Sequence, residues 1–481
     1  MLPTDFFNDL SLIVGSAFVR TDEEALAIYG QDGLKRGHRA EVVVIPASTS
    51  EVAAVAEACN ARRVPLVVRG GGTGYSGGSV PLRGGVTLSM ERFNRILEID
   101  QVNLLAVVEP NVVTGVLQEA VEKVGLFYPP DPASLRESVI GGNIAECAGG
   151  PRAFKYGTTK RYVLGLEAVL PTGEVIRTGS KAVKNVVGYD LTQLIVGSEG
   201  TLAIVTQAVL RLVPKPPACA TLRATFDSVE SAVEAVNELL RARVVPASLE
   251  LVDGECLAAV ARYLTAPPNP ADTGGVRLQP AGARTALAPE GTGALLLIEV
   301  DGMKEAVGAE AHRVEESCRA AGATEVLRAA TDEEREDLWR VRRELSPALK
   351  TIATRKFNHD VVVPRGRVPA LFDLIAALRR DYRVAIPSFG HAGDGNIHVN
   401  IKVDGADADA VARAHQAERR LFEGVVALEG SISGEHGIGF TKAPFVGNEL
   451  SHAVIALLKR VKGAFDPNGI LNPGKIFPDT D

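Results

Sequence analysis

The sequence predicts an α+β protein of two domains, and three observations support this fold class. The chain has 481 residues, of which 46% are hydrophobic, so it can bury more than one core. Short β-rich runs alternate with helix-like stretches along most of its length. The segment V-P-K-P-P-A at 213–218 is typical of an extended linker, because consecutive prolines stop a helix. We therefore expect domains at 1–216 and 217–425, with a C-terminal segment, 426–481, that returns to the first domain.

The first domain is predicted to be a mixture of strands and helices. We expect strands at 41–45, 65–69, 85–88 and 104–108, and helices at 50–62 and 114–124. Glycine-rich turns interrupt these elements at 70–78, 141–150 and 197–200. The many glycines indicate that backbone groups come close to a ligand in this half of the chain.

The second domain is predicted to be an open antiparallel sheet with helices on one face. We expect strands at 219–226, 249–252, 294–300 and 357–363, and helices at 304–321, 332–350 and 407–429. A loop rich in Pro, Gly and Ala is expected at 266–292.

Composition and charge exclude several classes of function. The net charge of -7 and the mixed charge distribution leave no basic stripe for a nucleic acid. The cysteines lie far apart and never form a C-x-x-C pair, which argues against a disulfide framework, an iron-sulfur cluster and a cysteine-based zinc site. We find no apolar run long enough to span a membrane and no signal-peptide pattern at residues 1–13. We expect a cytoplasmic protein, with any membrane association made through a partner.

A glycine-rich segment, R-G-G-G-T-G-Y-S-G-G at 69–78, follows a predicted strand and contains a G-x-G-x-x-G match. The usual dinucleotide fold would place a helix directly after the glycines, but Pro81 and two further glycines precede another strand. A lone loop of this kind could be only a flexible surface turn. Two further loops, at 129–150 and 196–205, favour an extended ligand whose phosphates are held by backbone N–H groups.

The stretch F-G-H-A-G-D-G-N-I-H-V-N-I-K-V at 389–403 carries candidate chemistry in the second domain. After the glycine turn, apolar residues from Ile397 to Val403 alternate with Asn396, His398 and Asn400 on the other face. A single histidine there would more often be a satisfied core residue. His391 comes from the turn before this strand, so two imidazoles are expected to meet in a polar cavity.

The segment G-S-I-S-G-E-H-G-I-G at 430–439 places Glu435 and His436 between glycines. An adjacent acid and imidazole are costly to bury, and a metal ligand beside a proton acceptor is a plausible use for them. Two imidazoles and one carboxylate suit Zn, Mn or Fe, and the sequence does not choose among these metals. A zinc hydrolase could use the same residues, although it would leave the glycine loops unexplained.

The predicted helix at 332–350 contains Arg342 and Ser346, which are four residues apart and are expected to share a face. A solvated charged face is the ordinary interpretation of such a helix, and it suits Arg340 and Arg343.

Several motifs together give a specific resemblance. These are R-G-G-G-T-G-Y-S-G-G, P-P-D-P-A-S, I-G-G-N-x-A-x-x-A-G-G, Y-G-x-x-x-x-Y-V-L-G-L-E, G-S-E-G-T-L-x-I-V, H-x-G-D-G-N-x-H-x-N, G-E-H-G-I-G and the terminal N-P-G-K. The set resembles the FAD-linked oxidase family of the vanillyl-alcohol oxidase type. It is most similar to the branch with D-lactate dehydrogenases, D-2-hydroxyglutarate dehydrogenase and the FAD subunit of glycolate oxidase. The likeness runs from about Ala40 to the end of the chain.

The resemblance implies a two-part FAD-binding domain of that type and a substrate (cap) domain. It implies non-covalent FAD, because covalent members carry a histidine in the first glycine loop, where this chain has Tyr75. Asn472 would approach the flavin ring. Cys147 departs from the family pattern, which usually has a polar amide there, and a small buried filler is its simplest interpretation. The residues that would hold FAD are Arg69, Gly70, Gly71, Gly72, Thr73, Gly74, Tyr75, Ser76, Gly77, Pro130, Asp131, Ser134, Gly141, Gly142, Asn143, Ala145, Gly149, Tyr156, Gly157, Glu199, Gly200, Ile204, Val205 and Asn472.

The resemblance also implies a divalent metal bound by His391, His398 and Glu435. His436 would accept a proton from the substrate. Arg342 would clamp the substrate carboxylate, assisted by Ser346, Lys356 and Asn400, although an acid usually stands in relatives where this chain has His359.

The implied activity is oxidation of a small D-2-hydroxy acid (D-lactate, glycolate or 2-hydroxyglutarate) by hydride transfer to the flavin. Electrons would pass to an external acceptor: a quinone, an electron-transfer flavoprotein or an iron-sulfur subunit. The alternatives are the FAD-binding catalytic subunit of a multi-subunit glycolate oxidase and, less favoured, a non-catalytic FAD-binding subunit. The identity of the acid stays open, and a homodimer is compatible with the sequence.

Overall fold

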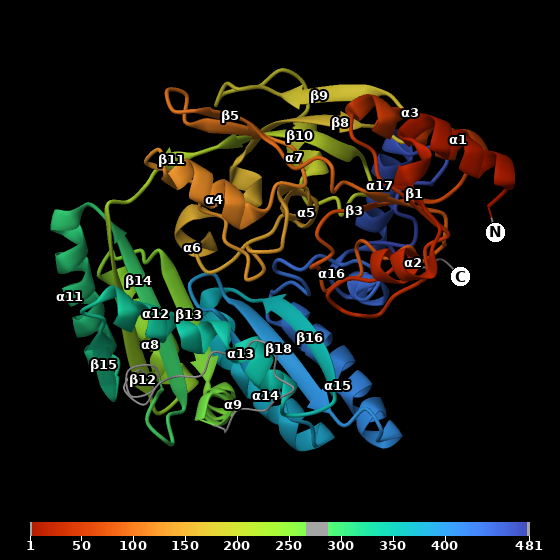
Figure 1. The fold of residues 1–481 in the computed structure, drawn as a ribbon. Helices are drawn as coiled ribbons and strands as arrows, with labels where there is room; N and C mark the ends of the chain where they lie inside the picture. The colour runs from red at the N-terminus through yellow and green to blue at the C-terminus, as the bar shows by residue number, and fades with distance from the viewer. Residues whose placement is uncertain (1, 266–286, 479–481) are drawn as a thin grey trace. The chain divides into compact units, whose positions relative to one another are not determined.

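The computed structural model describes residues 2–265 and 287–478, which form two compact units. Unit 1 comprises residues up to 150, residues 157–215 and the chain from 435 onward, and unit 2 comprises 151–156 and 216–434 (Figure 1). Most of the predicted loop at 266–292 lies outside the described residues. None of the helices described is long and apolar enough to cross a membrane.

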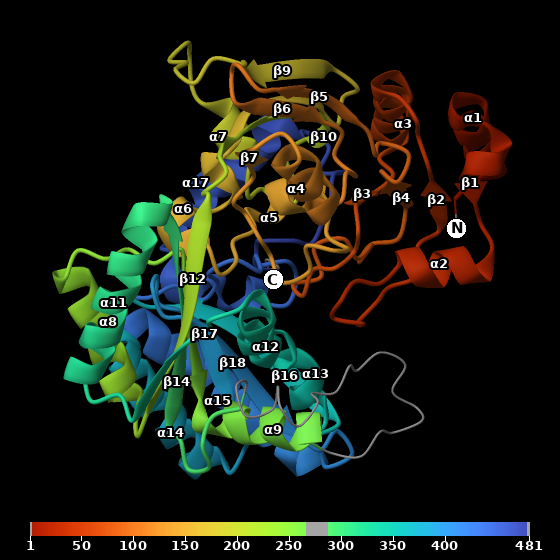
Figure 2. The ribbon, with the colours of Figure 1, turned by 60° about the vertical axis from the view of Figure 1, so that its left-hand side comes forward.

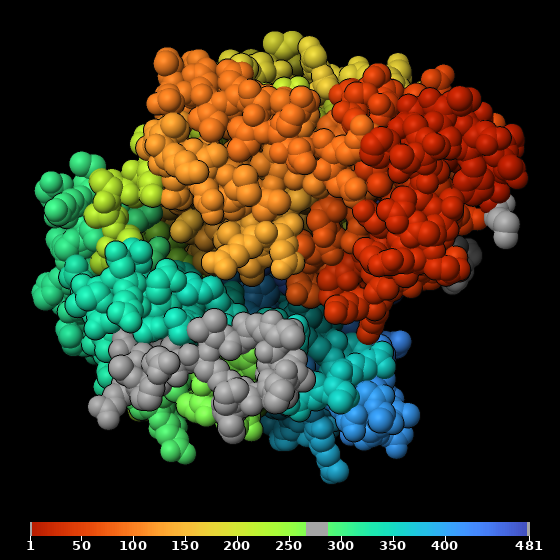
Figure 3. All heavy atoms as spheres, viewed as in Figure 1, coloured from red at the N-terminus to blue at the C-terminus, as the bar shows by residue number. Residues whose placement is uncertain are grey.

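The first sheet of unit 1 has four strands in the order β1-β2-β4-β3. The strands β2, β4 and β3 run parallel, and the short β1 pairs antiparallel with β2. The bounds are β1 Val19–Arg20, β2 Val42–Val44, β3 Leu66–Arg69, β4 Val86–Ser89, α1 Thr4–Val14, α2 Glu23–Tyr29 and α3 Thr49–Arg62. In the space-filling view, N-terminal residues form a broad part of the surface of this unit (Figure 3).

Helix α3 shows why this layer forms where the sequence predicts it. Ser48 caps the helix by accepting a hydrogen bond from the backbone N–H of Glu51, whose carboxylate accepts one from the N–H of Ala47 at 2.8 Å. Val52, Val55, Ala56 and Cys59 form a buried stripe that packs on β2, β3 and β4. Because this packing and the parallel pairing with β4 fix β3, the glycine loop that follows β3 begins at a well-supported strand end.

The second sheet of unit 1 is antiparallel, with five strands in the order β5-β6-β10-β8-β9. A two-stranded pair, β11-β7, lies outside it. The strands are β5 Ile96–Asp100, β6 Leu105–Val108, β7 Leu126–Phe127, β8 Val163–Val169, β9 Val175–Gly179, β10 Ile204–Arg211 and β11 Val213–Pro214. The helices are α4 Thr114–Glu122, α5 Ile140–Glu146, α7 Leu191–Ile195, α16 Val446–Glu449 and α17 His452–Phe465.

Helix α5 corrects the expectation of an open glycine loop at its position. Ile140 and Ile144, one helical turn apart, are both fully buried, which offsets the low helix propensity of Gly141 and Gly142. The buried Asn143 donates from Nδ2 to Oγ1 of Thr114 at 2.7 Å. Tertiary packing therefore decides the structure of this segment.

Unit 2 contains a seven-stranded antiparallel sheet in the order β15-β12-β14-β13-β17-β18-β16. The strands are β12 Ala218–Phe226, β13 Ser248–Asp253, β14 Ala294–Gly302, β15 Glu325–Arg328, β16 Arg355–Val362, β17 Ser388–His391 and β18 Asn396–Val403. The helices are α6 Ala153–Tyr156, α8 Val229–Arg241, α9 Gly254–Thr265, α11 Lys304–Ala320, α12 Asp332–Arg343, α13 Leu345–Lys350, α14 Val368–Tyr382 and α15 Ala408–Ala427. The antiparallel sheet is as predicted.

The prediction that helices cover only one face of this sheet was wrong. Leu295 and Leu297 of β14 pack in one cluster with α9, α12 and α13. Leu296 and Ile298 alternate with them and are equally buried, on the face covered by α8 and α11 (Figure 2). A strand covered on both faces has no polar alternation, which matches the run A-L-L-L-I in β14.

The predicted helix at 332–350 is two helices, α12 and α13, separated at Glu344. Pro347 explains the break, because its ring lacks an N–H and would clash with the carbonyl of Arg343 in a continuous helix. Arg342 and Ser346 therefore belong to different helices, and the expectation that they share one helix face was wrong.

Candidate active site

Four neighbouring strands of unit 2 present a polar face. On β18, His398 and Asn400 lie on this face, as the alternating sequence predicts. His398 pairs with Asp360 of β16 and with Phe389 of β17, so all three share the face. Ile397, Val399 and Ile401 are buried on the opposite face. The sheet thus carries the candidate site residues on one face and buried apolar residues on the other.

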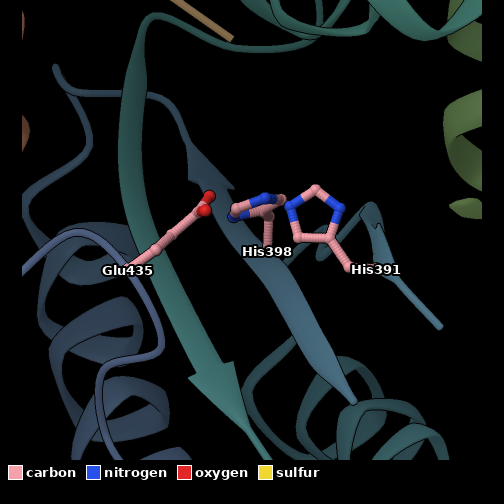
Figure 4. Close-up of side chains that lie close together, drawn as sticks. All are labelled: His391, His398 and Glu435. Atoms are coloured by element: carbon pink, nitrogen blue, oxygen red, sulfur yellow. The ribbon is translucent and has the colours of Figure 1, made fainter. Parts of the chain in front are cut away.

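His391, His398 and Glu435 form a group that could hold a metal ion, with one ligand atom from each lying within 4.8 Å of the others (Figure 4). Both histidines are buried, on β17 and β18, with ring centroids 5.4 Å apart and planes at 83°. Two imidazole nitrogens and a carboxylate oxygen are a donor set that fits Zn²⁺, Mn²⁺ or Fe²⁺.

Glu435 follows directly on Gly434, the last residue of unit 2. The N–H of Gly434 donates to Oδ2 of Asp360 at 2.9 Å, which ties this segment to β16. A Cβ at position 434 would overlap the side-chain amide of Asn396, so the chain passes close to β18 only because this residue is glycine. In unit 1, a Cβ on Gly149 would lie 2.8 Å from Oε2 of Glu435.

A buried carboxylate that the sequence analysis did not single out, Glu250 on β13, contacts two of the predicted site residues. Its Oε1 lies 2.5 Å from Nδ1 of His391, and its Oε2 accepts a hydrogen bond from Nε of Arg342. Burial alone would raise the pKa of Glu250, but the charges and hydrogen bonds of His391 and Arg342 outweigh it and lower the pKa to about 2. The sequence does contain one sign of this residue, an acid inside the apolar run S-L-E-L-V. Burying an acid in a strand is costly unless the acid is paired.

Arg342 lies near the end of α12 with its guanidinium carbon 4.7 Å from the centroid of the Phe389 ring. Only 12% of its side chain is exposed. Because Glu250 engages Nε and Phe389 stacks on the guanidinium, the side chain is held in one orientation.

Lys356 and Asn400 occupy the same polar face further along the strands. Burial, and to a smaller extent the positive charges of Lys402 and Lys350, together lower the pKa of Lys356 to about 8. Asn400 donates from Nδ2 to the carbonyl oxygens of Pro387 at 3.1 Å and His398 at 3.0 Å. Ser346 lies on α13.

His359, the residue that departs from the family pattern, points away from this face. It pairs with Val399 on the apolar side of the sheet, and its Nε2 lies 3.1 Å from Oε1 of Glu418 on α15. Because adjacent strand residues face opposite sides, the substitution at 359 leaves the surroundings of Lys356 unchanged.

In unit 1 the first glycine loop follows β3. Gly72 and Gly77 have φ of 64° and 82°, which favour glycine, and a Cβ on Gly77 would overlap Phe440. Gly74 has open space on its Cβ side. Ser76 is buried, and its Oγ has no hydrogen-bond partner among the residues that the structure describes. An unpaired buried hydroxyl beside an open backbone fits a loop that binds a ligand.

Glu199 and Asn472, both predicted to contact FAD, form hydrogen bonds with other residues of unit 1. The Glu199 carboxylate accepts hydrogen bonds from the N–H groups of Ile438 at 2.7 Å and Gly439 at 2.6 Å. Asn472 donates from Nδ2 to the carbonyl oxygens of Gly78 at 2.8 Å and Glu199 at 2.7 Å. Burial raises the pKa of Glu199. These residues fasten the glycine loop to the C-terminal segment.

Two further predicted site residues are His436, the expected proton acceptor, and Tyr156, which was expected to hold FAD. The His436 ring lies 5.6 Å from the Tyr75 ring, and its Nε2 is 3.9 Å from Oε1 of Glu435. Tyr156 belongs to the short segment of unit 2 at 151–156, where its hydroxyl donates to Oδ2 of Asp301 at 2.6 Å. That hydrogen bond gives the Tyr156 hydroxyl a structural role within unit 2.

Family models match most of the chain. The model described as "FAD linked oxidases, C-terminal domain" matches residues 215–476, and the model described as "FAD binding domain" matches residues 40–179. The two matches fall largely on unit 2 and unit 1.

Three curated relatives are similar along nearly the whole chain. The chain is 42% identical to "Glycolate oxidase subunit GlcD" of Bacillus subtilis, over 91% of this chain and 89% of the relative. It is 34% identical to "D-lactate dehydrogenase" of Anaerostipes hadrus, over 94% and 91%. It is 34% identical to "D-2-hydroxyglutarate dehydrogenase" of Stutzerimonas stutzeri, over 98% of both chains.

Among solved structures, p-cresol methylhydroxylase with substrate bound has a TM-score of 0.79 at 18% identity, over 99% of this chain and 97% of the other. At this identity the likeness concerns the fold alone, and it agrees with the two-part architecture predicted from the sequence.

Proposed function

The chain belongs to the family of FAD linked oxidases, and we propose that it oxidises a small D-2-hydroxy acid to the 2-oxo acid. The observation that carries the proposal is the polar face of unit 2. There, the candidate metal ligand His391 and the cation Arg342 meet at one carboxylate, that of Glu250. A 2-hydroxy acid carries a hydroxyl and a carboxylate on adjacent carbons, so it suits a metal and an arginine held close together. The names of the three relatives all specify 2-hydroxy acids.

FAD fits the glycine loops of unit 1 without a covalent link. The open side of Gly74 and the Oγ of Ser76, which has no hydrogen-bond partner in the described part of the chain, support binding at the first loop. That loop contains Tyr75 and no histidine, the residue that the resemblance associates with a covalent flavin. Bound FAD would supply the redox chemistry by accepting a hydride from C2 of the substrate.

A divalent metal fits the donor set of His391, His398 and Glu435. With Nδ1 of His391 engaged by Glu250, coordination would go through its Nε2. The metal would supply Lewis acidity that lowers the pKa of the substrate hydroxyl. Zn, Mn and Fe all suit these ligands.

The chain's own residues then have distinct roles. Arg342 binds the substrate carboxylate through its guanidinium, and Ser346 and Lys356 add donors to it. His436 accepts the proton of the hydroxyl oxygen as the C2–H bond breaks. Asn400 ties β18 to Pro387, the residue before β17, and also donates to the carbonyl oxygen of His398, which would hold the second histidine ligand in place.

The reduced flavin must pass its electrons onward, and we propose an external acceptor: a quinone, an electron-transfer flavoprotein or an iron-sulfur subunit. A homodimer is compatible with this scheme. A second candidate, the FAD-binding catalytic subunit of a multi-subunit glycolate oxidase, is favoured by the 42% identity to a relative named as such a subunit.

Turnover with a panel of 2-hydroxy acids tests the proposal. The metal-loaded flavoprotein is assayed with D-lactate, L-lactate, glycolate and both enantiomers of 2-hydroxyglutarate, with an artificial dye as acceptor and detection of the 2-oxo acid. We expect one of the D-acids or glycolate to be oxidised. Oxidation of an L-acid alone would contradict the D-specificity, and a colourless purified protein with hydrolase activity would favour the zinc hydrolase instead.

A further inference from the structure

Glu250 is a buried carboxylate of unit 2 that contacts two candidate site residues. It lies on β13 between β14 and β17, its side chain is fully buried, and its register partner on β17 is His391. Each of its two carboxylate oxygens serves a different residue: Oε1 contacts Nδ1 of His391 at 2.5 Å, and Oε2 accepts from Nε of Arg342. One carboxylate thus joins the candidate metal ligand to the candidate substrate clamp.

Each contact has a physical consequence. A carboxylate on Nδ1 keeps the proton there, which directs Nε2 toward a metal and makes the imidazole a more basic ligand. A carboxylate on Nε of Arg342 leaves the two Nη groups as the donors that can bind a substrate carboxylate end on, with two hydrogen bonds. The ring centroid of Phe389 lies 4.7 Å from the guanidinium carbon, and this contact restricts rotation of the guanidinium group.

We propose that Glu250 is a positioning residue that orients the metal ligand His391 and the substrate clamp Arg342 together, so that metal affinity and substrate affinity both depend on it. The inference rests on the proposed function, since it takes the metal site and the carboxylate clamp from there. It adds a residue that touches neither substrate nor flavin but on which the geometry of both binding groups depends.

A second buried carboxylate on the same strand supplies a matched control. Asp253 is 3% exposed, and its Oδ2 accepts from Nη2 of Arg379 and from the N–H of Ser388. Asp253 therefore shares with Glu250 a place on β13, burial and an arginine partner, but it contacts neither His391 nor Arg342. A general loss of packing would affect both variants alike, whereas positioning of the site depends only on Glu250.

The first test measures Zn²⁺ affinity by competition with a chelator, using the FAD-loaded full-length protein, with Zn²⁺ alone as the probe. Glutamine at 250 can accept from Nδ1 of His391 but supplies no charge and cannot also accept from Arg342 through its NH₂ group. We expect E250Q to bind Zn²⁺ about 10–100-fold more weakly than wild type, and D253N to bind it within about threefold of wild type. Equal Zn²⁺ affinity of E250Q and wild type would overturn the inference, as would an equal loss in D253N.

The second measurement separates positioning from a structural role through KM and kcat with the D-acid identified by the panel, at saturating Zn²⁺. Since Glu250 orients Arg342, we expect E250Q to raise KM about tenfold or more while FAD content stays unchanged. A KM unchanged from wild type under saturating metal would contradict a role in orienting Arg342.

E250Q leaves Arg342 buried without its anion, and it could fail to fold for that reason. The variant E250Q/R342Q removes both charges and keeps the test available. We expect the double variant to bind Zn²⁺ about tenfold or more weakly than R342Q, because His391 still lacks its anionic partner. Equal affinities of the double variant and R342Q would overturn the inference.

Failure of the proposed function would look different. If wild type binds no Zn²⁺, or if H398A binds it as wild type does, the metal site itself is wrong. If wild type binds Zn²⁺ through His398 and E250Q matches it, only the role of Glu250 is wrong.

Discussion

Oδ2 of Asp360 accepts a hydrogen bond from the backbone N–H of Gly434 at 2.9 Å. This bond fastens the segment before Glu435 to the strand that pairs with His398. The position of one candidate ligand thus depends on backbone contacts of the residue before it, and this dependence can be tested by adding a single methyl group.

We predict that G434A weakens metal binding. The added Cβ would overlap the amide of Asn396, which cannot turn away easily because it is buried and donates to the carbonyl oxygen of Val361 at 3.1 Å. The backbone must shift, at a cost of about 1–3 kcal/mol of stability, and Glu435 shifts with it. Zn²⁺ titration should show affinity reduced about tenfold or more. The control is G447A, where the Cβ meets open space; equal affinities of the two variants would show that Gly434 does not position Glu435.

The hydroxyl of Ser76 is predicted to bind FAD. It is buried without a hydrogen-bond partner among the described residues, so FAD would satisfy it. Removing one such hydrogen bond costs about 0.5–1.5 kcal/mol, so S76A should raise the Kd for FAD about two- to tenfold. Fluorescence titration of the apoprotein measures this Kd. S248A removes another buried hydroxyl without a partner in the described chain, on β13 of unit 2, and should leave FAD affinity unchanged.

Substrate affinity should fall as pH rises through about 8. Burial and neighbouring lysines lower the pKa of Lys356 from its ordinary range to about 8, so this side chain is cationic below that pH and neutral above it. The KM for an anionic substrate should therefore rise between pH 7 and pH 9. In K356M the KM should be higher at pH 7 and nearly constant over this range. A wild-type rise in KM that persists unchanged in K356M would assign the titration to another group.

His436 is predicted to be the base. H436A should retain FAD at the wild-type level, while the rate of flavin reduction by the D-acid falls about 10²–10⁴-fold. Anaerobic stopped-flow absorbance measures that rate. H452A changes an exposed histidine at the start of α17 and serves as the control. Normal reduction in H436A would remove this residue from the mechanism.

Much of the candidate site could be predicted from the sequence because its residues lie in short, strongly patterned segments. The alternation from Asn396 to Val403 follows from strand geometry, and the register with β16 and β17 confirms it. The ligand roles of His391, His398 and Glu435 stay a prediction, although their ligand atoms do lie together.

Features that depend on tertiary packing could not be predicted in this way. Glu250 meets His391 only through the order of strands in the sheet, which no local pattern reveals. Helix α5 forms despite two glycines because Ile140 and Ile144 are buried. The break at Glu344, by contrast, has a local signal in the sequence, because Pro347 follows three residues later and removes a backbone N–H donor.

Anaerobic mixing of the metal-loaded flavoprotein with each enantiomer of lactate and 2-hydroxyglutarate, and with glycolate, tests the central claim most directly. The absorbance of the oxidised flavin is followed through a single turnover. We predict that one D-acid or glycolate bleaches the flavin, that the L-enantiomers do not, and that prior removal of the metal by a chelator slows the bleaching. A yellow, metal-loaded protein whose flavin no 2-hydroxy acid reduces would contradict the claim that this chain oxidises such acids.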